Sequence, residues 1–147
     1  MKKSVIAVTL AGLLAVPTAA PAAKPPPPVR MFDIDGVLTD PELTKLLPEG
    51  VKYYFGNQPA AVVKVIGPLK VSRRTTHGKG ELVACRWAMT SALIGLGTNA
   101  KVQGGNAVVG IQSNLENIPS SSDTQFKCAL GGMMVNVALI GNAAVVE

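Results

Sequence analysis

The chain has 147 residues, of which 48% are hydrophobic and only 4% aromatic, and it contains 15 Gly, 11 Pro and 2 Cys. That length allows a single small domain with an attached export or linker segment. Lys and Arg number 14 against 9 Asp and Glu. This excess is weak and no aromatic residues alternate with basic ones, so the composition argues against a nucleic-acid-binding protein.

Residues 1–22 predict a secretory signal peptide, because a basic start with two lysines precedes a short apolar run over residues 5–16. The run is too short to span a bilayer. Ala20-Pro21-Ala22 fits the small-x-small rule of signal peptidase, with cleavage before Ala23. Cleavage removes two lysines, which lowers the net charge from +5 to +3, and no cysteine near the cut could carry a lipid. We therefore expect a periplasmic or secreted protein without stable membrane insertion; an uncleaved membrane anchor is the alternative.

Residues 23–30 predict a proline-rich linker. The run from Pro25 to Pro28 lacks backbone N–H donors and favours extended polyproline geometry. We expect it to act as a spacer, or as an unstructured tail without a role, in front of a single domain over residues 31–147. The pattern of that domain is best defined over residues 48–147.

The segment from Met31 to Asp40 resembles the first motif of haloacid-dehalogenase-type phosphatases, hydrophobic-Asp-x-Asp-Gly-Val-Leu-Thr. The resemblance implies that Asp33 is the nucleophile, that Asp35 is the acid/base, and that a Mg²⁺ ion is bound. The chain departs from that family because too few strand-forming residues precede the motif, and because the later carboxylates are scattered singly. We favour a turn-forming loop around Gly36 and keep the phosphatase as the alternative.

Two strands are expected next. Val51–Phe55 is rich in strand formers, and Ala61–Val71 is a second apolar run bent at Gly67-Pro68. Residues 72–80 predict a polar, basic loop that contains the only histidine, His77. Because no second histidine or acidic ligand lies close in sequence, we expect His77 to be solvated and predict no metal site there.

Residues 81–103 show helical spacing, and Gly104-Gly105 follow as a C-terminal cap. Gly95 and Gly97 each weaken helix propensity by about 1 kcal/mol relative to Ala, so packing must stabilise this helix. Advancing each residue by about 100° places a single apolar stripe on the expected core face. That stripe comprises Cys85, Ala88, Met89, Ala92, Leu93, Leu96 and Ala100.

A second apolar cluster lies on the opposite side of the same helix and comprises Val83, Trp87 and Ile94. Apolar residues on both sides indicate either a helix covered twice or a face kept for a partner. Folding of residues 29–47 over Trp87 is slightly favoured over an oligomer contact. The cluster is the candidate interface of the protein, with the exposed edge of the sheet as the alternative surface.

The rest of the chain predicts an antiparallel meander. Its expected parts are a strand over 106–112, a loop over 117–123, a strand over 125–130, a bulge at Gly131-Gly132, a strand over 133–140, a turn at Gly141-Asn142 and a last strand over 143–146. The predicted fold class is α+β, with one long helix packed on a small, mostly antiparallel sheet in the order ββαβββ.

The two cysteines fall where they can face each other, Cys85 on the core stripe of the helix and Cys128 on the inner face of the strand over 125–130. In an oxidising compartment we expect a disulfide, which would close a loop of roughly 40 residues and stabilise the fold by about 4 kcal/mol. Two buried free thiols are the alternative. A catalytic redox pair is disfavoured because no Cys-x-x-Cys is present.

Several segments resemble a family of exported bacterial proteins whose members are often labelled "excinuclease ATPase subunit". They are residues 84–88, 91–93, 105–113, 121–128 and 137–141. More distantly, residues 48–147 are similar to the YbjQ-like domain, once called heavy-metal-binding, and to the folded domain of the Rcs envelope-stress lipoprotein RcsF. The resemblance implies the same α+β fold. The chain lacks the lipid-bearing cysteine and second disulfide of RcsF, so membrane anchoring and stress signalling are not implied.

The sequence contains no Gly-x4-Gly-Lys-Ser/Thr loop to hold phosphates, so the ATPase label is not supported. Two cysteines that pair with each other leave no soft metal ligands, so we expect no metal and no cofactor. The expected function is non-enzymatic: binding of an unidentified envelope protein, or self-association. The Mg²⁺-dependent phosphatase and a metal-binding protein are the alternatives.

Overall fold

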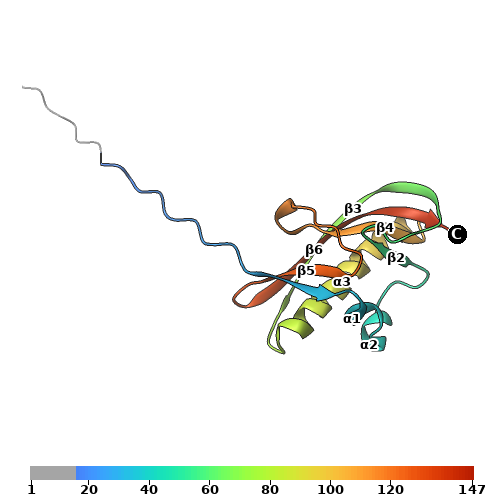
Figure 1. Ribbon diagram of the computed structural model, residues 1–147, viewed down its shortest axis with the longest axis horizontal. Coiled ribbons are helices and arrows are strands. Elements are labelled where there is room, and N and C mark those ends of the chain that lie inside the picture. Colours follow the sequence, from blue (N-terminus) through green and yellow to red (C-terminus); the bar gives the residue numbers. More distant parts are fainter. Residues whose placement is uncertain (1–15) are drawn as a thin grey trace, which may run out of the picture.

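The computed structural model describes residues 16–147 (Figure 1). Residues 16–28 are exposed and lead away from the folded domain as a long extended segment (Figure 1). Most of the predicted signal peptide, residues 1–15, lies outside the described residues. The first strand begins at Val29, inside the predicted linker, and the backbone N–H of Leu130 donates to the Pro28 carbonyl at 2.7 Å.

The domain is α+β, as the sequence predicts: one long helix packs on a mostly antiparallel, curled sheet. Its elements are β1 (Val29–Asp33), α1 (Asp35–Leu38), α2 (Pro41–Thr44), β2 (Lys52–Phe55), β3 (Val62–Thr76), α3 (Glu81–Val102), β4 (Ala107–Ser113), the 3₁₀ turn η1 (Leu115–Asn117), β5 (Gln125–Leu130) and β6 (Met134–Val146).

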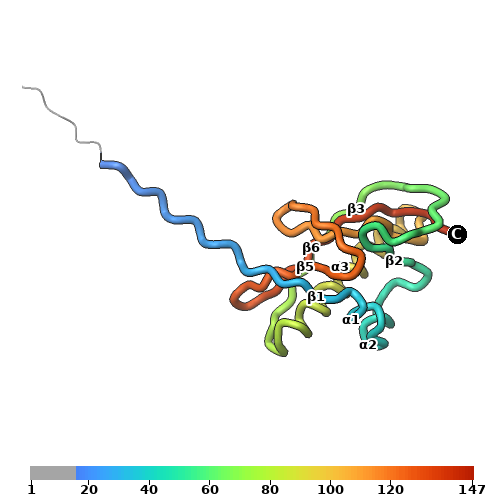
Figure 2. Tube along the Cα trace, in the orientation of Figure 1, coloured from blue at the N-terminus to red at the C-terminus, as the bar shows by residue number. Residues whose placement is uncertain are grey.

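Strand β6 is the centre of the sheet (Figure 2). One of its edges pairs with β3 from Thr76↔Met134 to Val62↔Val146. Its other edge pairs first with β5 and then with β4, both antiparallel. Strand β1 extends the sheet beyond β5, and β2 extends it beyond β4 in the only parallel pairing among the described strands. The sheet therefore ends in three edge strands, β1, β2 and β3.

The predicted loop over residues 72–80 is wrong in its first half, because residues 72–76 continue β3. These residues pair with β6 from Ser72↔Ala138 to Thr76↔Met134. Their polar and basic character is typical of a loop, but four of the five are exposed, and an exposed edge strand accepts such residues readily. Pairing with a distant strand decided the structure here.

Two expected glycine features also differ. Gly141-Asn142 form no turn, because β6 runs unbroken through them. A Cβ at Gly141 would lie 2.9 Å from Cγ1 of Val108, so this glycine allows close approach of β4 rather than chain reversal.

Gly131 and Gly132 form no bulge and instead belong to the turn between β5 and β6, in which the N–H of Gly131 donates to the Met134 carbonyl at 2.9 Å. The register shift falls in β4 between Val109 and Gln112. There Gly110 has φ +62°, a left-handed conformation that favours glycine.

The seven residues of the predicted core stripe of α3 are all fully buried, which confirms the helical spacing. They lie against the inner face of the sheet, which contributes Val71, Phe126, Val135, Val137 and Leu139 among others. This shared core holds a helix that contains two internal glycines, as expected when packing rather than propensity stabilises it.

Candidate interaction surface

Helix α3 has two flanks between its buried face and solvent. The covered flank comprises Arg86, Leu93 and Gly97, and residues 34–53 lie against it. The Tyr53 hydroxyl donates to the Leu93 carbonyl at 3.0 Å. A Cβ at Gly97 would clash with that hydroxyl, and a Cβ at Gly36 would lie 2.6 Å from Nη2 of Arg86.

The open flank comprises Val83, Trp87 and Ile94, the three predicted interface residues. Val83 is 40% and Trp87 45% exposed, and Ile94 is half-buried. The helical spacing of the sequence therefore placed this cluster correctly on the outer side of α3. The expectation that residues 29–47 fold over Trp87 is wrong: that segment packs on the covered flank instead, with Ile34, Val37 and Leu43 buried in the core.

A groove runs beside the open flank, between α3 and β3. Its central part has a volume of about 360 Å³ and is lined by Arg73, Ser91, Ile94, Gly95, Thr98 and Asn99. A second hollow of about 400 Å³ lies towards the start of the helix, where Trp87 and Val83 face Thr75, Thr76 and Lys79. Small helical side chains leave this space unfilled, and Gly95 itself allows Val71 and Arg73 of β3 to approach.

The groove is basic. Arg73 and Lys79 line it, and no acidic residue does. Nη1 of Arg73 donates to the Ser72 carbonyl at 3.0 Å. The ion pairs formed within residues 16–147 are Arg30–Glu81 and Lys45–Glu42, so the charges of Arg73 and Lys79 are not neutralised by neighbours. Sequence reasoning missed the groove, because β3 was expected to end at Val71.

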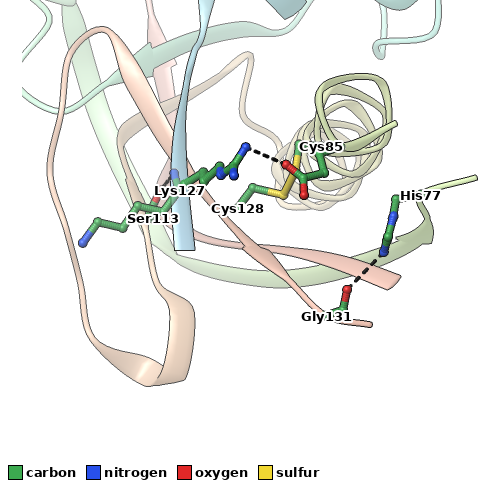
Figure 3. The surroundings of a disulfide bond; sticks show 8 residues. His77, Cys85, Ser113, Lys127, Cys128 and Gly131 are labelled. Carbon is green, nitrogen blue, oxygen red and sulfur yellow. Dashed lines mark hydrogen bonds and ion pairs between the residues drawn. A yellow bond between two sulfur atoms is a disulfide. The ribbon is translucent and has the colours of Figure 1, made fainter. Parts of the chain in front are cut away.

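A disulfide fixes the helix that carries this surface. Cys85 of α3 and Cys128 of β5 form the predicted bond, with a Cα–Cα distance of 6.0 Å and both residues fully buried (Figure 3). Arg30 of β1 pairs with Glu81 in the first turn of α3 at 2.8 Å. The alternative of two free thiols is excluded. The bond fits an oxidising, extracytoplasmic compartment.

His77 has a structural role that the sequence did not reveal. Its Nε2 lies 3.0 Å from the Gly131 carbonyl oxygen and 3.2 Å from that of Gly132 (Figure 3). Two carbonyl neighbours require Nε2 to carry the proton and donate. The ring therefore ties the turn before α3 to the β5–β6 turn rather than being merely solvated.

The two aspartates of the phosphatase-like motif are both exposed. Asp33 ends the edge strand β1, and its Oδ1 accepts a hydrogen bond from Nε2 of Gln125 at 3.2 Å. Asp35 begins the four-residue helix α1. Strand β1 is antiparallel to its neighbour, whereas the motif requires the end of a buried parallel strand. Over residues 16–147, no three His, Cys, Asp or Glu residues are grouped so that they could hold a metal ion.

The described part of the chain contains no helix with the length and apolar character needed to cross a membrane. The resemblances described under Sequence analysis remain predictions. No protein-family model matches the chain, and no curated protein does either.

Proposed function

We propose that this domain is a non-enzymatic protein-binding module of the bacterial periplasm, and that the open flank of α3 is its contact surface. The observation that carries the proposal is Trp87. It is the only tryptophan of the chain, it is 45% exposed, and it lies between Val83 and Ile94 on a helix whose opposite face is buried in the core. Tryptophan is strongly enriched among residues that dominate binding energies.

The surface is also preorganised. The Cys85–Cys128 bond and the covered flank fix α3 on both sides of its buried face. A partner that binds the open flank therefore orders little backbone, which lowers the entropic cost of association. An exposed apolar stripe beside unpaired basic residues, which form a polar rim, is a typical arrangement for a protein interface.

A photo-crosslinking experiment in intact cells tests the proposal. A photoreactive amino acid replaces Leu82, which is 45% exposed next to Val83, or in the control variant Ile118, which is 67% exposed in the loop after η1. We expect irradiation to give a discrete crosslinked species from position 82 and none from position 118. Adding Trp87→Asp to the first variant should abolish that species.

The mass of the crosslinked species separates the two forms of the proposal. Twice the mass of the chain indicates self-association, and any other mass indicates a different envelope protein. Equal crosslinking from both positions, or crosslinking that survives Trp87→Asp, would contradict the open flank as the contact surface.

A further inference from the structure

Strand β3 has one edge without a partner. It is 15 residues long, about three times the usual strand length, and among the described elements only β6 pairs with it. From Gly67↔Ala143 to Thr76↔Met134 the register with β6 has no shift. This part of β3 therefore presents an edge of regular register beside the groove.

The direction of the free backbone groups follows from one hydrogen bond. The N–H of His77 donates to the Met133 carbonyl at 3.4 Å, so odd-numbered residues of β3 bond to β6 in the unbroken register. The N–H and C=O groups of Lys70, Ser72 and Arg74 then point to the open edge. Pro68 falls in the same set, where its missing N–H costs no bond to β6.

The charge of this edge selects the partner. Strand β3 carries Lys64, Lys70, Arg73 and Arg74 and no acidic residue. Pairing β3 with β3 of a second copy would place eight positive charges together, and such charges on an edge disfavour self-pairing. A strand with acidic side chains has the opposite effect, since it would neutralise these cations as it pairs.

The groove gives the added strand a second contact. Leu69 and Val71 are buried under α3, and Arg73 lies against Gly95 of that helix. A strand beside β3 would turn every second side chain to the same face, into the space lined by Ser91, Ile94 and Thr98. Main-chain bonds and alternate side-chain pockets are the two elements of recognition by strand addition.

We infer that β3 binds an acidic, extended segment of the partner protein as an additional strand, with every second side chain in the groove beside Ile94 and Trp87. This inference rests on the proposed function, because it names the chemistry of the partner at the same surface. Binding replaces the contact between Arg73 and the Ser72 carbonyl, and the guanidinium group is then free to pair with a carboxylate.

The probe is a synthetic peptide in which glutamate alternates with valine, with blocked ends and enough length to span residues 68–76. Trp87 fluorescence reports binding, and amide hydrogen exchange reports its place. We expect saturable binding that weakens with added salt. Exchange should slow at Lys70, Ser72 and Arg74, whose N–H groups are free, and remain unchanged at Val71 and Thr75, which already bond to β6.

Two control peptides separate strand addition from simple charge attraction. In the first, lysine replaces glutamate. In the second, alternate backbone nitrogens are methylated, which removes the donors that pair with β3 but keeps all carboxylates. Each change should weaken binding by roughly tenfold or more. Equal binding of the methylated peptide would overturn the inference.

Charge reversal on the protein gives the matched comparison. Arg74→Glu should weaken binding of the acidic peptide by roughly tenfold or more. Lys45→Glu makes the same change in net charge at the residue that follows α2, where Lys45 is exposed, and should leave binding unchanged. Equal losses in both variants, or no binding of the acidic peptide to the natural chain, would overturn strand addition. A crosslink from position 82 in cells would then still support the proposed function.

Discussion

Each flank of α3 carries large apolar side chains, Leu93 on one and Trp87 and Ile94 on the other, but the flanks differ in what surrounds them. On the covered flank Leu93 is fully buried, and residues 34–53 lie against the helix and bring the Tyr53 hydroxyl to its backbone. On the open flank Trp87 stays 45% exposed, and a groove lies beside Ile94. Apolar character alone therefore does not determine which side of a helix belongs to the core, because segments distant in sequence decide which side is buried.

The largest expected effect on stability comes from removing the Cys85–Cys128 disulfide, which ties the buried face of α3 to β5. The double variant Cys85→Ala, Cys128→Ala should lower the free energy of unfolding by about 4 kcal/mol, because the unfolded chain gains the entropy of the loop that the disulfide closes. Urea denaturation followed by Trp87 fluorescence and circular dichroism measures it. Reduction of the natural chain is the control and should give a similar loss. A change below about 1 kcal/mol would show that the bond does not anchor the helix.

An intermediate effect compares the two sides of the helix directly, since Gly97 lies on the covered flank and Gly95 lines the groove beside the open flank. Gly97→Ala places a methyl group against the Tyr53 hydroxyl and Cγ of Pro48. Such overpacking costs about 1–3 kcal/mol, which outweighs the gain of about 1 kcal/mol in helix propensity.

Gly95→Ala is the matched control on the open side. Its nearest neighbours are the flexible end of Arg73 at 2.9 Å and Cγ2 of Val71 at 3.0 Å. Its effect on the free energy of unfolding should therefore be close to zero. Equal destabilisation by both variants would contradict the difference between the flanks.

A smaller effect sharpens the description of the covered flank. Tyr53→Phe removes the hydrogen bond to the Leu93 carbonyl, which should lower the free energy of unfolding by about 0.5–1.5 kcal/mol. Tyr54→Phe is the control, because Tyr54 is half-buried in the same strand and has no such bond among the described contacts.

The same residue predicts a pH dependence. Burial raises the pKa of Tyr53 above its ordinary value, which is about 10 in the unfolded chain. Above that pH the unfolded chain releases the proton while the folded chain keeps it, so the free energy of unfolding falls as the pH rises. Chemical denaturation at a series of alkaline pH values should show this fall in the natural chain and a smaller one in Tyr53→Phe. Identical profiles would contradict it.

The sequence predicted those features that depend on local periodicity. The helix, its buried stripe and the facing of Cys85 and Cys128 follow from a repeat that each segment carries by itself. The same helical spacing placed Val83 and Trp87 on the outer side of α3. The fold class and the exposed cluster were therefore within reach of sequence reasoning.

Features that depend on pairing between distant segments could not be predicted from the sequence. Residues 72–76 are polar and basic, and only their pairing with β6 makes them part of a strand. Gly141 has the composition of a turn, and only the approach of Val108 explains it. The position of residues 29–47 depends on the pairing of β1 with β5 and on the burial of Ile34, Val37 and Leu43 in the core, which no local pattern reports. The groove was missed because it lies beside the half of β3 that looked like a loop.

Strand β6 follows every other strand along the chain, and yet three of them, β3, β4 and β5, pair with it. Strand β1 in turn depends on β5, and Val29 pairs with Ala129. Before β6 is available, the chain can form only the separate pairs β1–β5 and β2–β4, and contacts this distant in sequence make folding slow. Until then Leu69 and Val71 of β3, which are buried in the folded domain, stay unprotected, which makes the newly made chain dependent on rapid folding or on a chaperone that holds it open.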